Sequence, residues 1–165
     1  MIVVSNTSPL HYLIAVQQAE VLPQLFETIH VPPAVIRELS HANTPPAVRQ
    51  WAATRPSWLG IDPLARPLDV ELYASLDQGE AEAIQLAEEK HADLLIMDEW
   101  KGRTIAQRRG LPLTGALGIL GIAYQKRILE DPMGILAMMR VQGFRIHERL
   151  AESFQNLLQS RYLRD

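Results

Sequence analysis

The sequence contains no cysteine, which excludes disulfide scaffolds, thiolate zinc sites, iron–sulfur clusters and cysteine nucleophiles. It has no excess of basic residues either, because 16 lysines and arginines stand against 19 aspartates and glutamates. The broad basic surface typical of duplex-binding proteins is therefore not expected. No apolar run approaches the ~20 residues of a membrane span, and the first residues lack the pattern of a secretory signal. We expect a cytoplasmic protein with no membrane partner.

The composition is that of an ordinary globular domain. Of the 165 residues, 47% are hydrophobic and 21% are charged, which argues against disorder and fibres. The length fits one domain, and there are no repeats, low-complexity segments or shifts in composition. We predict a single domain over residues 1–165, with its motifs in a core of about residues 1–125 and C-terminal helices at about residues 131–160.

Short aliphatic runs alternate with longer helical patterns, which predicts an α/β fold: a three-layer α/β/α sandwich around a mainly parallel sheet. Strands are expected at residues 2–4, 28–31, 58–61, 94–97 and 111–114. Helices are expected at residues 9–14, 21–26, 33–39, 44–53, 78–90, 99–109, 115–124, 133–141 and 147–158. Ser8, followed by Pro9, is the expected N-cap of the first helix.

Polar side chains mark the carboxyl ends of these strands, where open α/β sheets bind their ligands. Asn6 follows the first strand, Asp98 the fourth and Thr114 the fifth. Glu38 and Glu80 lie on helices that point back to the same edge. A cluster of oxygen ligands suits a hard cation, Mg²⁺ or Mn²⁺. We expect the oxygens of Asn6, Glu38, Glu80 and Asp98 to converge in one cleft.

Glu80 is the most informative of these residues. At 100° per residue it shares the apolar stripe of its helix with Ala83 and Ile84, whereas Glu82 and Glu89 are expected on the solvent side. A carboxylate on a core-facing stripe is costly unless something neutralises it.

Each candidate also has a purely structural interpretation. Glu80 suits the third helical position of a capping box with Asp77. Asp98 can be the N-cap of the next helix, Glu38 a solvated charge or the partner of a neighbouring arginine, and Asn6 a turn residue. The prediction of a site therefore depends on the convergence of all four.

Other chemistries find less support. The five histidines form neither H-x-H nor HExxH, so zinc is not expected. Residues 115–121 read G-x-x-G-x-x-G after a strand, which suits close helix packing or a phosphate-binding turn. A small-molecule-binding α/β domain that uses this turn stays an open alternative.

Four segments resemble the successive motifs of the PIN-domain family. They are VVSNTSPL at 3–10, VPPAVIREL at 31–39, LDQGEAEAI at 76–84 and LLIMDE at 94–99, with LTG at 113–115 on the next strand. In the third segment Gly-Glu stands where most PIN domains place Asp, which is similar to one prokaryotic branch, the VapC-like toxins. The resemblance covers about residues 1–125.

The resemblance implies a ribonuclease that uses Mg²⁺ or Mn²⁺, commonly the toxin of a toxin–antitoxin pair and often a homodimer. RNA and an antitoxin protein are the partners it implies. The catalytic and metal-binding positions carried over are Asn6, Glu38, Glu80 and Asp98, supplemented by Glu82 or Glu99. The substrate-binding positions are Thr7, Ser8, Lys101, Arg103 and Thr114; Lys101 and Arg103 suit the RNA backbone, or simply a solvated helix face.

The sequence departs from the PIN pattern at its first acidic position. Asn6 stands where the family has Asp. Its amide still offers a neutral oxygen to a cation but adds no charge, so metal affinity should fall and a second metal ion is less favoured. The main alternative is therefore a catalytically weak or dead PIN-like module that binds RNA or an antitoxin without cutting.

Overall fold

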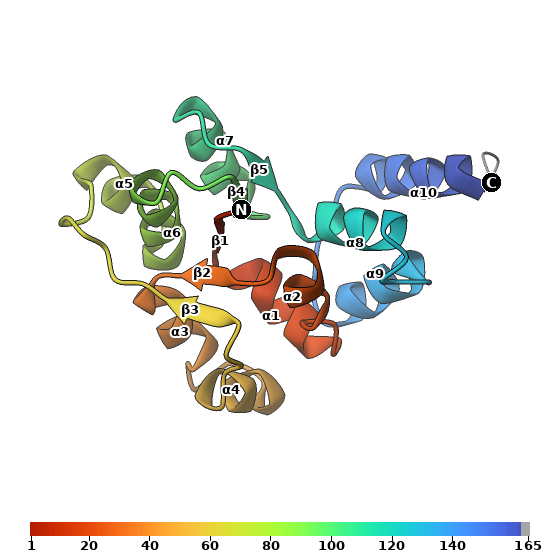
Figure 1. Ribbon diagram of the computed structural model, residues 1–165, viewed down its shortest axis with the longest axis horizontal. Helices are drawn as coiled ribbons and strands as arrows, with labels where there is room; N and C mark the ends of the chain where they lie inside the picture. The colour runs from red at the N-terminus through yellow and green to blue at the C-terminus, as the bar shows by residue number, and fades with distance from the viewer. Residues whose placement is uncertain (163–165) are drawn as a thin grey trace.

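Five parallel strands form the centre of the structure (Figure 1). The computed structural model describes residues 1–162. The strands are β1 (Val3–Ser5), β2 (Ile29–Val31), β3 (Leu59–Ile61), β4 (Leu94–Ile96) and β5 (Leu113–Thr114). Their order in the sheet is β3-β2-β1-β4-β5, and each neighbouring pair is parallel. The predicted α/β sandwich with a parallel sheet is confirmed.

Helices connect the strands and continue beyond the last one. They are α1 (Thr7–Ala15), α2 (Val21–Phe26), α3 (Pro33–Leu39), α4 (Pro46–Ala53), α5 (Val70–Ser75), α6 (Gln78–Glu89), α7 (Trp100–Arg108), α8 (Ala116–Gln125), α9 (Pro132–Val141) and α10 (Glu148–Tyr162). Helix α5 was not predicted from the sequence. The other elements lie within a few residues of their predicted positions.

The start of α1 differs from the prediction. The N-cap is Asn6, with an extended backbone, and the helix begins at Thr7, so the assignment of Ser8 as the N-cap was wrong. Asparagine is as good an N-cap as serine, and Pro9 is tolerated within the first turn, where its missing N–H has no helical partner. The side chain of Asn6 makes no capping hydrogen bond.

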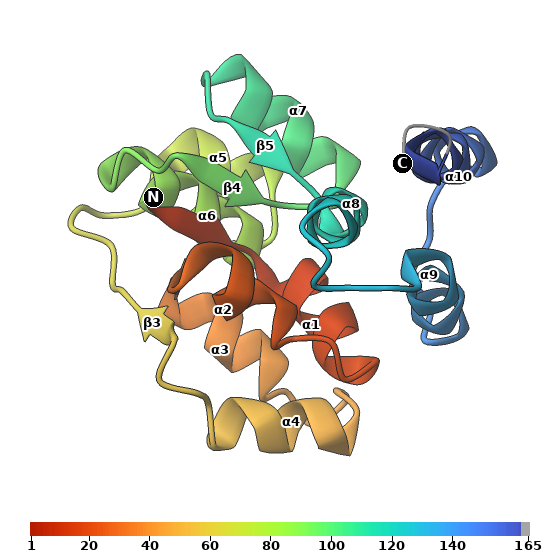
Figure 2. The same ribbon diagram turned by 45° about the vertical axis from the view of Figure 1, so that its right-hand side comes forward.

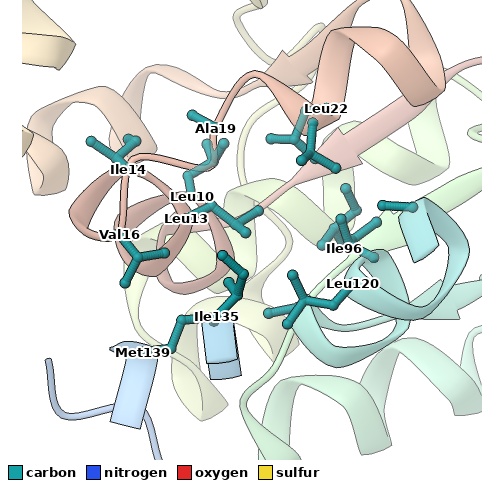
Figure 3. Close-up of a cluster of buried hydrophobic side chains, with 14 of the residues drawn as sticks. Leu10, Leu13, Ile14, Val16, Ala19, Leu22, Ile96, Leu120, Ile135 and Met139 are labelled. Carbon is teal, nitrogen blue, oxygen red and sulfur yellow. The ribbon is translucent and has the colours of Figure 1, made fainter. Parts of the chain in front are cut away.

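Successive strand residues point alternately into two hydrophobic cores, one on each face of the sheet. Val3 and Ile96 belong to the core that contains α1, α2 and α8, and Figure 3 shows Ile96 beside Leu13 and Leu120 of this cluster. Val4 and Leu95 face the other core, which is built with α5, α6 and α7. The sheet is thus covered on both faces, as parallel sheets usually are.

The C-terminal helices extend the first of these cores. Figure 2 shows α9 and α10 beyond α8, at one side of the sheet. A Cβ atom on Gly121 of α8 would lie 3.3 Å from the ring of Phe154 on α10. Glycine therefore allows the two helices to approach closely, which supports the packing interpretation of the glycine spacing. Within residues 1–162, no helix is long and apolar enough to cross a membrane.

Leu13 provides a test of the first core. Its side chain is fully buried, whereas Leu157 of α10 is 57% exposed. We expect Leu13→Ala to lower the free energy of unfolding by ~2–5 kcal/mol, because it leaves a cavity among packed side chains. The control Leu157→Ala should change it by about 0.5 kcal/mol or less. Urea denaturation of both variants makes the comparison, and equal losses would contradict this description of the core.

Candidate functional site

The pairing of β1 with β4 places Asn6 and Asp98 at the same edge of the sheet. Ser5 and Ile96, the last residues of the two strands, are aligned in register. The Asn6 N–H donates to the Ile96 carbonyl at 3.1 Å, which continues the ladder beyond the strand ends. Asn6 and Asp98 therefore leave neighbouring strands at their carboxyl ends, where α/β folds bind ligands.

Asn6 and Asp98 each carry a buried oxygen without a partner. Asn6 is only 2% exposed, and its Oδ1 accepts no hydrogen bond from residues 1–162. Asp98 is not an N-cap as one interpretation proposed, since Glu99 holds that position. Instead Asp98 Oδ1 accepts from the N–H of Ala116 at 2.9 Å, while its buried Oδ2 has no partner in the described part of the chain. Such unpaired buried oxygens are rare and point to a ligand or to strain.

Glu38 joins the site through two other elements. It accepts hydrogen bonds from the Thr7 hydroxyl of α1 and, at 3.1 Å, from the Gly79 N–H of α6. A Cβ atom on Gly79 would lie 2.7 Å from the Glu38 carboxyl carbon, so only glycine leaves room for this approach. Glu38 is therefore neither a solvated charge nor the partner of Arg37, whose guanidinium lies 3.7 Å from Glu82.

Glu80 lies deeper, at the start of α6, and is 7% exposed. The predicted capping box is confirmed: the Glu80 N–H donates to Asp77 at 2.8 Å, and the Asp77 N–H donates to Glu80 Oε2 at 3.3 Å. On the other side, a Cβ atom on Gly102 of α7 would lie 3.4 Å from Glu80 Oε1. The capping role does not remove Glu80 from the site, because the first turn of α6 lies at the carboxyl edge.

The expectation that Glu82 and Glu89 face solvent was wrong. The side chains are only 12% and 9% exposed, respectively. Glu82 accepts from the N–H of Ala34, and Glu89 accepts from the N–H of Ala65 at 2.7 Å. The reason is that α6 is covered by α3 and by the segment before α5 as well as by the sheet, so its polar face is enclosed too.

Like charges crowd around Glu80. Burial, followed by the charge of Asp77 and those of Glu99 and Glu38, raises the pKa of Glu80 to about 7, although the Asp77 N–H acts in the opposite direction. Burial also raises the pKa of Glu38, with Asp77 adding to the effect. Asp77 and Glu99 therefore belong to the acidic cluster together with the predicted residues.

The pKa of Asp98 is also raised, but a different set of neighbouring groups acts on it. Burial is the main cause that raises its pKa to about 6, and the negative charge of Glu99 adds to it. The Ala116 N–H and the positive charge of Arg103 oppose the shift. Arg103 is held beside the aspartate because its Nη1 donates to the Met97 carbonyl at 2.7 Å. The guanidinium is thus a cation placed at the edge of the acidic cluster.

The predicted residues are divided between two neighbouring hollows. The smaller hollow, of about 240 Å³, is lined by Asn6, Thr7, Ser8 and Glu38 together with Asp77 and Glu99. The larger hollow, of about 530 Å³, has Asp98, Arg103 and Thr114 at one end and apolar side chains of α8 and α10 along the rest. Glu80, which is buried, and Lys101, which is exposed on α7, line neither hollow.

The donor set fits a hard divalent cation. In the described part of the chain, no three acidic or histidine side chains are already arranged as a metal cage. Mg²⁺ does not need one, because it usually keeps several waters and binds through one or two carboxylates. Among the described residues, the buried side-chain oxygens without a hydrogen-bond partner are Asn6 Oδ1 and Asp98 Oδ2. A cation beside them would also offset the crowded carboxylate charges.

Several residues around the hollows were not singled out from the sequence. Asp77 was treated only as a cap, although its place at the start of α6 puts it at the carboxyl edge. His11 and Tyr12 also line the smaller hollow. Their pattern in α1 gave no signal, because an aromatic residue in an apolar helix is usually a core residue.

The comparison with known families agrees with the fold. A family model described as a PIN domain matches residues 2–160, nearly the whole chain. No curated protein matches the chain.

The raised pKa of Glu80 predicts how stability depends on pH without metal. A carboxyl group that titrates at about 7 in the folded protein and near 4.5 when unfolded binds its proton more tightly in the folded state. Its contribution to stability is present below pH 4.5 and is lost as the pH rises to 7. Wild type in EDTA should therefore melt several degrees lower at pH 8 than at pH 5, and Glu80→Gln should reduce this difference, the remainder coming from Asp98 and Glu38, whose pKa values are also raised. An unchanged difference in the variant would contradict the assignment to Glu80.

Proposed function

The chain belongs to the PIN-domain family, and we propose that it is a divalent-metal-dependent ribonuclease that hydrolyses RNA phosphodiesters. PIN domains have a nuclease-type fold and generally depend on divalent metal ions. The observation that carries the proposal is the pair of buried, unpartnered oxygens on Asn6 and Asp98 at the carboxyl edge. Mg²⁺ and Mn²⁺ are the cations that suit these oxygen donors.

In the proposed hydrolysis, different side chains would bind the cation, add negative charge and contact the phosphate. Asn6 and Asp98 would hold the cation, which when bound supplies an acidified water and offsets negative charge on the phosphate. Glu38 and Glu80 add the anionic charge that Asn6 lacks, and their hydrogen bonds keep them in place. Arg103, which lines the larger hollow beside Asp98, would contact a phosphate there.

The remaining predicted contacts lie around this centre. Ser8 lines the smaller hollow and Thr114 the larger one, so these hydroxyl groups are available to ribose or phosphate. Thr7 also lines the smaller hollow, but its hydroxyl donates to Glu38 and could only accept a hydrogen bond from RNA. Lys101 is exposed on the first turn of α7 and makes no ion pair within the described residues. It suits a backbone phosphate farther along the RNA. Because the cluster is acidic, such contacts should give modest, salt-sensitive binding.

We further infer that the protein is the toxin of a toxin–antitoxin pair and a cytoplasmic homodimer. The segment 76–84, with Gly79-Glu80 in the third motif, supports the toxin branch. Exposed apolar side chains on the C-terminal helices support a protein-binding surface, because such groups favour burial against a partner. They are Met138 and Val141 of α9 and Leu150 and Leu157 of α10.

Asn6 favours a second candidate function. A neutral amide in place of a carboxylate weakens attraction to a cation, so the chain could instead bind RNA or an antitoxin without cutting it. The two candidates share the site and differ only in whether its charge suffices for hydrolysis. Restoring the missing charge distinguishes them.

Asn6→Asp should strengthen metal binding. We expect the variant to melt below wild type in EDTA, because it adds a like charge to the acidic cluster, and to gain more in melting temperature from Mn²⁺ than wild type does. Asn156→Asp, on the exposed face of α10, makes the same change in charge far from the site and should behave as wild type. Thermal melts with and without Mn²⁺ measure the shifts. An equal Mn²⁺ response in Asn6→Asp and wild type would argue against a cation at Asn6.

Asp98→Asn should abolish cleavage. Wild type is expected to cut single-stranded RNA slowly in Mn²⁺ and not in EDTA, and Asn6→Asp should cut faster. Asp131→Asn is the matched control, because asparagine retains the N-cap of α9 while the same charge is removed. Gel analysis of labelled RNA follows the reaction. If wild type and Asn6→Asp bind Mn²⁺ yet neither cuts RNA, the non-catalytic module is the correct function.

A further inference from the structure

One wall of the smaller hollow is aromatic and is not used by the proposed hydrolysis. His11 and Tyr12 of α1 form this wall, and Asn6 and Glu38 line the same hollow. Their ring centroids lie 5.0 Å apart at 63°, so the rings do not stack on each other. Tyr12 also meets the buried ring of Phe144 edge-on, at 5.2 Å and 66°.

The polar groups of this wall are uncharged and unengaged. Neither the imidazole of His11 nor the hydroxyl of Tyr12 has a hydrogen-bond partner among residues 1–162. Burial lowers the pKa of His11, which favours the neutral form of the ring. Burial, Glu99 and Asp98 raise the pKa of Tyr12, so its hydroxyl stays protonated. The wall therefore presents two neutral rings with free polar groups.

The smaller hollow is lined by negatively charged side chains, so uncharged rings are better suited to bind RNA there. Glu38, Asp77 and Glu99 line it, and no described lysine or arginine does. These carboxylates repel a phosphodiester chain and a single cation offsets only part of their charge. Affinity for RNA at this point must come from contacts that do not depend on positive charge. Stacking of a base on an aromatic ring is such a contact.

We propose that His11 and Tyr12 form a stacking subsite for one unpaired base of single-stranded RNA, next to the phosphate that the site cuts. The position of the base relative to the cut rests on the proposed function, whereas the subsite itself needs only that RNA binds. A base inside a duplex cannot enter, because both its faces are already stacked. The subsite thus selects single-stranded RNA.

The connection between α9 and α10 completes the subsite on its outer side. A Cβ atom on Gly143 would lie 3.8 Å from the Tyr12 hydroxyl. Arg145, two residues later, is exposed, and its positive charge acts on the Tyr12 hydroxyl in opposition to Asp98 and Glu99. A nucleotide stacked on Tyr12 would have acids on one side and this guanidinium on the other. Arg145 is therefore placed to bind the phosphate that leads away from the acidic cluster.

Equilibrium binding of short RNAs tests the subsite without cleavage. The probes are a fluorescein-labelled single-stranded RNA and a series in which each position in turn is abasic, measured by anisotropy with Ca²⁺ in place of Mn²⁺. Wild type should bind at least one abasic RNA about 5- to 150-fold more weakly than the intact RNA, since stacking is worth ~1–3 kcal/mol per base. If no abasic position weakens binding, or no RNA binds, the inference is wrong.

Variants of Tyr12 test whether the weaker binding of abasic RNA depends on its aromatic ring. Tyr12→Leu should bind intact and abasic RNA almost equally, while Tyr12→Phe should retain the discrimination because it keeps the ring. Tyr73→Leu, at an exposed tyrosine of α5 that lines neither hollow, should also retain it. Arg145→Ala should weaken binding of every RNA by the same factor, as expected for a phosphate contact. Full discrimination in a folded Tyr12→Leu protein would overturn the inference.

The experiment distinguishes failure of the stacking subsite from failure of the proposed ribonuclease function. Cleavage of the intact RNA in Mn²⁺ is measured in parallel on the same proteins. Discrimination that depends on Tyr12 without any cleavage supports the subsite and contradicts the ribonuclease. Cleavage by wild type, with discrimination and KM unchanged in Tyr12→Leu, supports the ribonuclease and contradicts the subsite.

Discussion

The parallel pairing of β1 with β4 is the constraint on which the site depends. Val3, Val4 and Ser5 align with Leu94, Leu95 and Ile96, so Asn6 and Asp98 leave the sheet at the same level. A shift of β1 by one residue would exchange the faces of Val3 and Val4, and each would then have to fit the opposite core. Because both faces of the sheet are buried, the hydrophobic cores specify the register. The relative position of the two site residues follows from that packing.

A cost in electrostatic energy accompanies this arrangement. The strand ends and the first turn of α6 collect Glu38, Asp77, Glu80, Asp98 and Glu99 at one edge, where burial and mutual repulsion raise three pKa values. Backbone N–H groups at helix starts compensate in part, since those of α6 and α8 donate to the carboxylates. Local features that conflict with stability are expected at functional sites. The conflict here is one that a bound cation relieves.

The sequence predicted those parts of the site that depend on local order. Asp98 was found because it follows an aliphatic strand, and Glu80 because it interrupts an apolar stripe while it completes a capping box. The contacts of Glu38 were not predictable in the same way. Its partners Thr7 and Gly79 lie 31 and 41 residues away in the chain. The period of α6 was likewise misleading for Glu82 and Glu89, because a helix covered on several sides does not keep a solvent-facing stripe.

By itself, therefore, the sequence determined the class of fold, the order of its strands and helices, and which polar residues end the strands. These follow from hydrophobic periodicity and from hydrogen bonds between near neighbours, which the chain carries in any window of a few residues. Only the tertiary structure decided that Asn6 makes no capping bond, that Asp98 accepts from the first N–H of α8 and is not the N-cap of α7, and that two aromatic rings line the smaller hollow. Burial and the partners of a buried oxygen depend on segments that meet in space from distant parts of the chain.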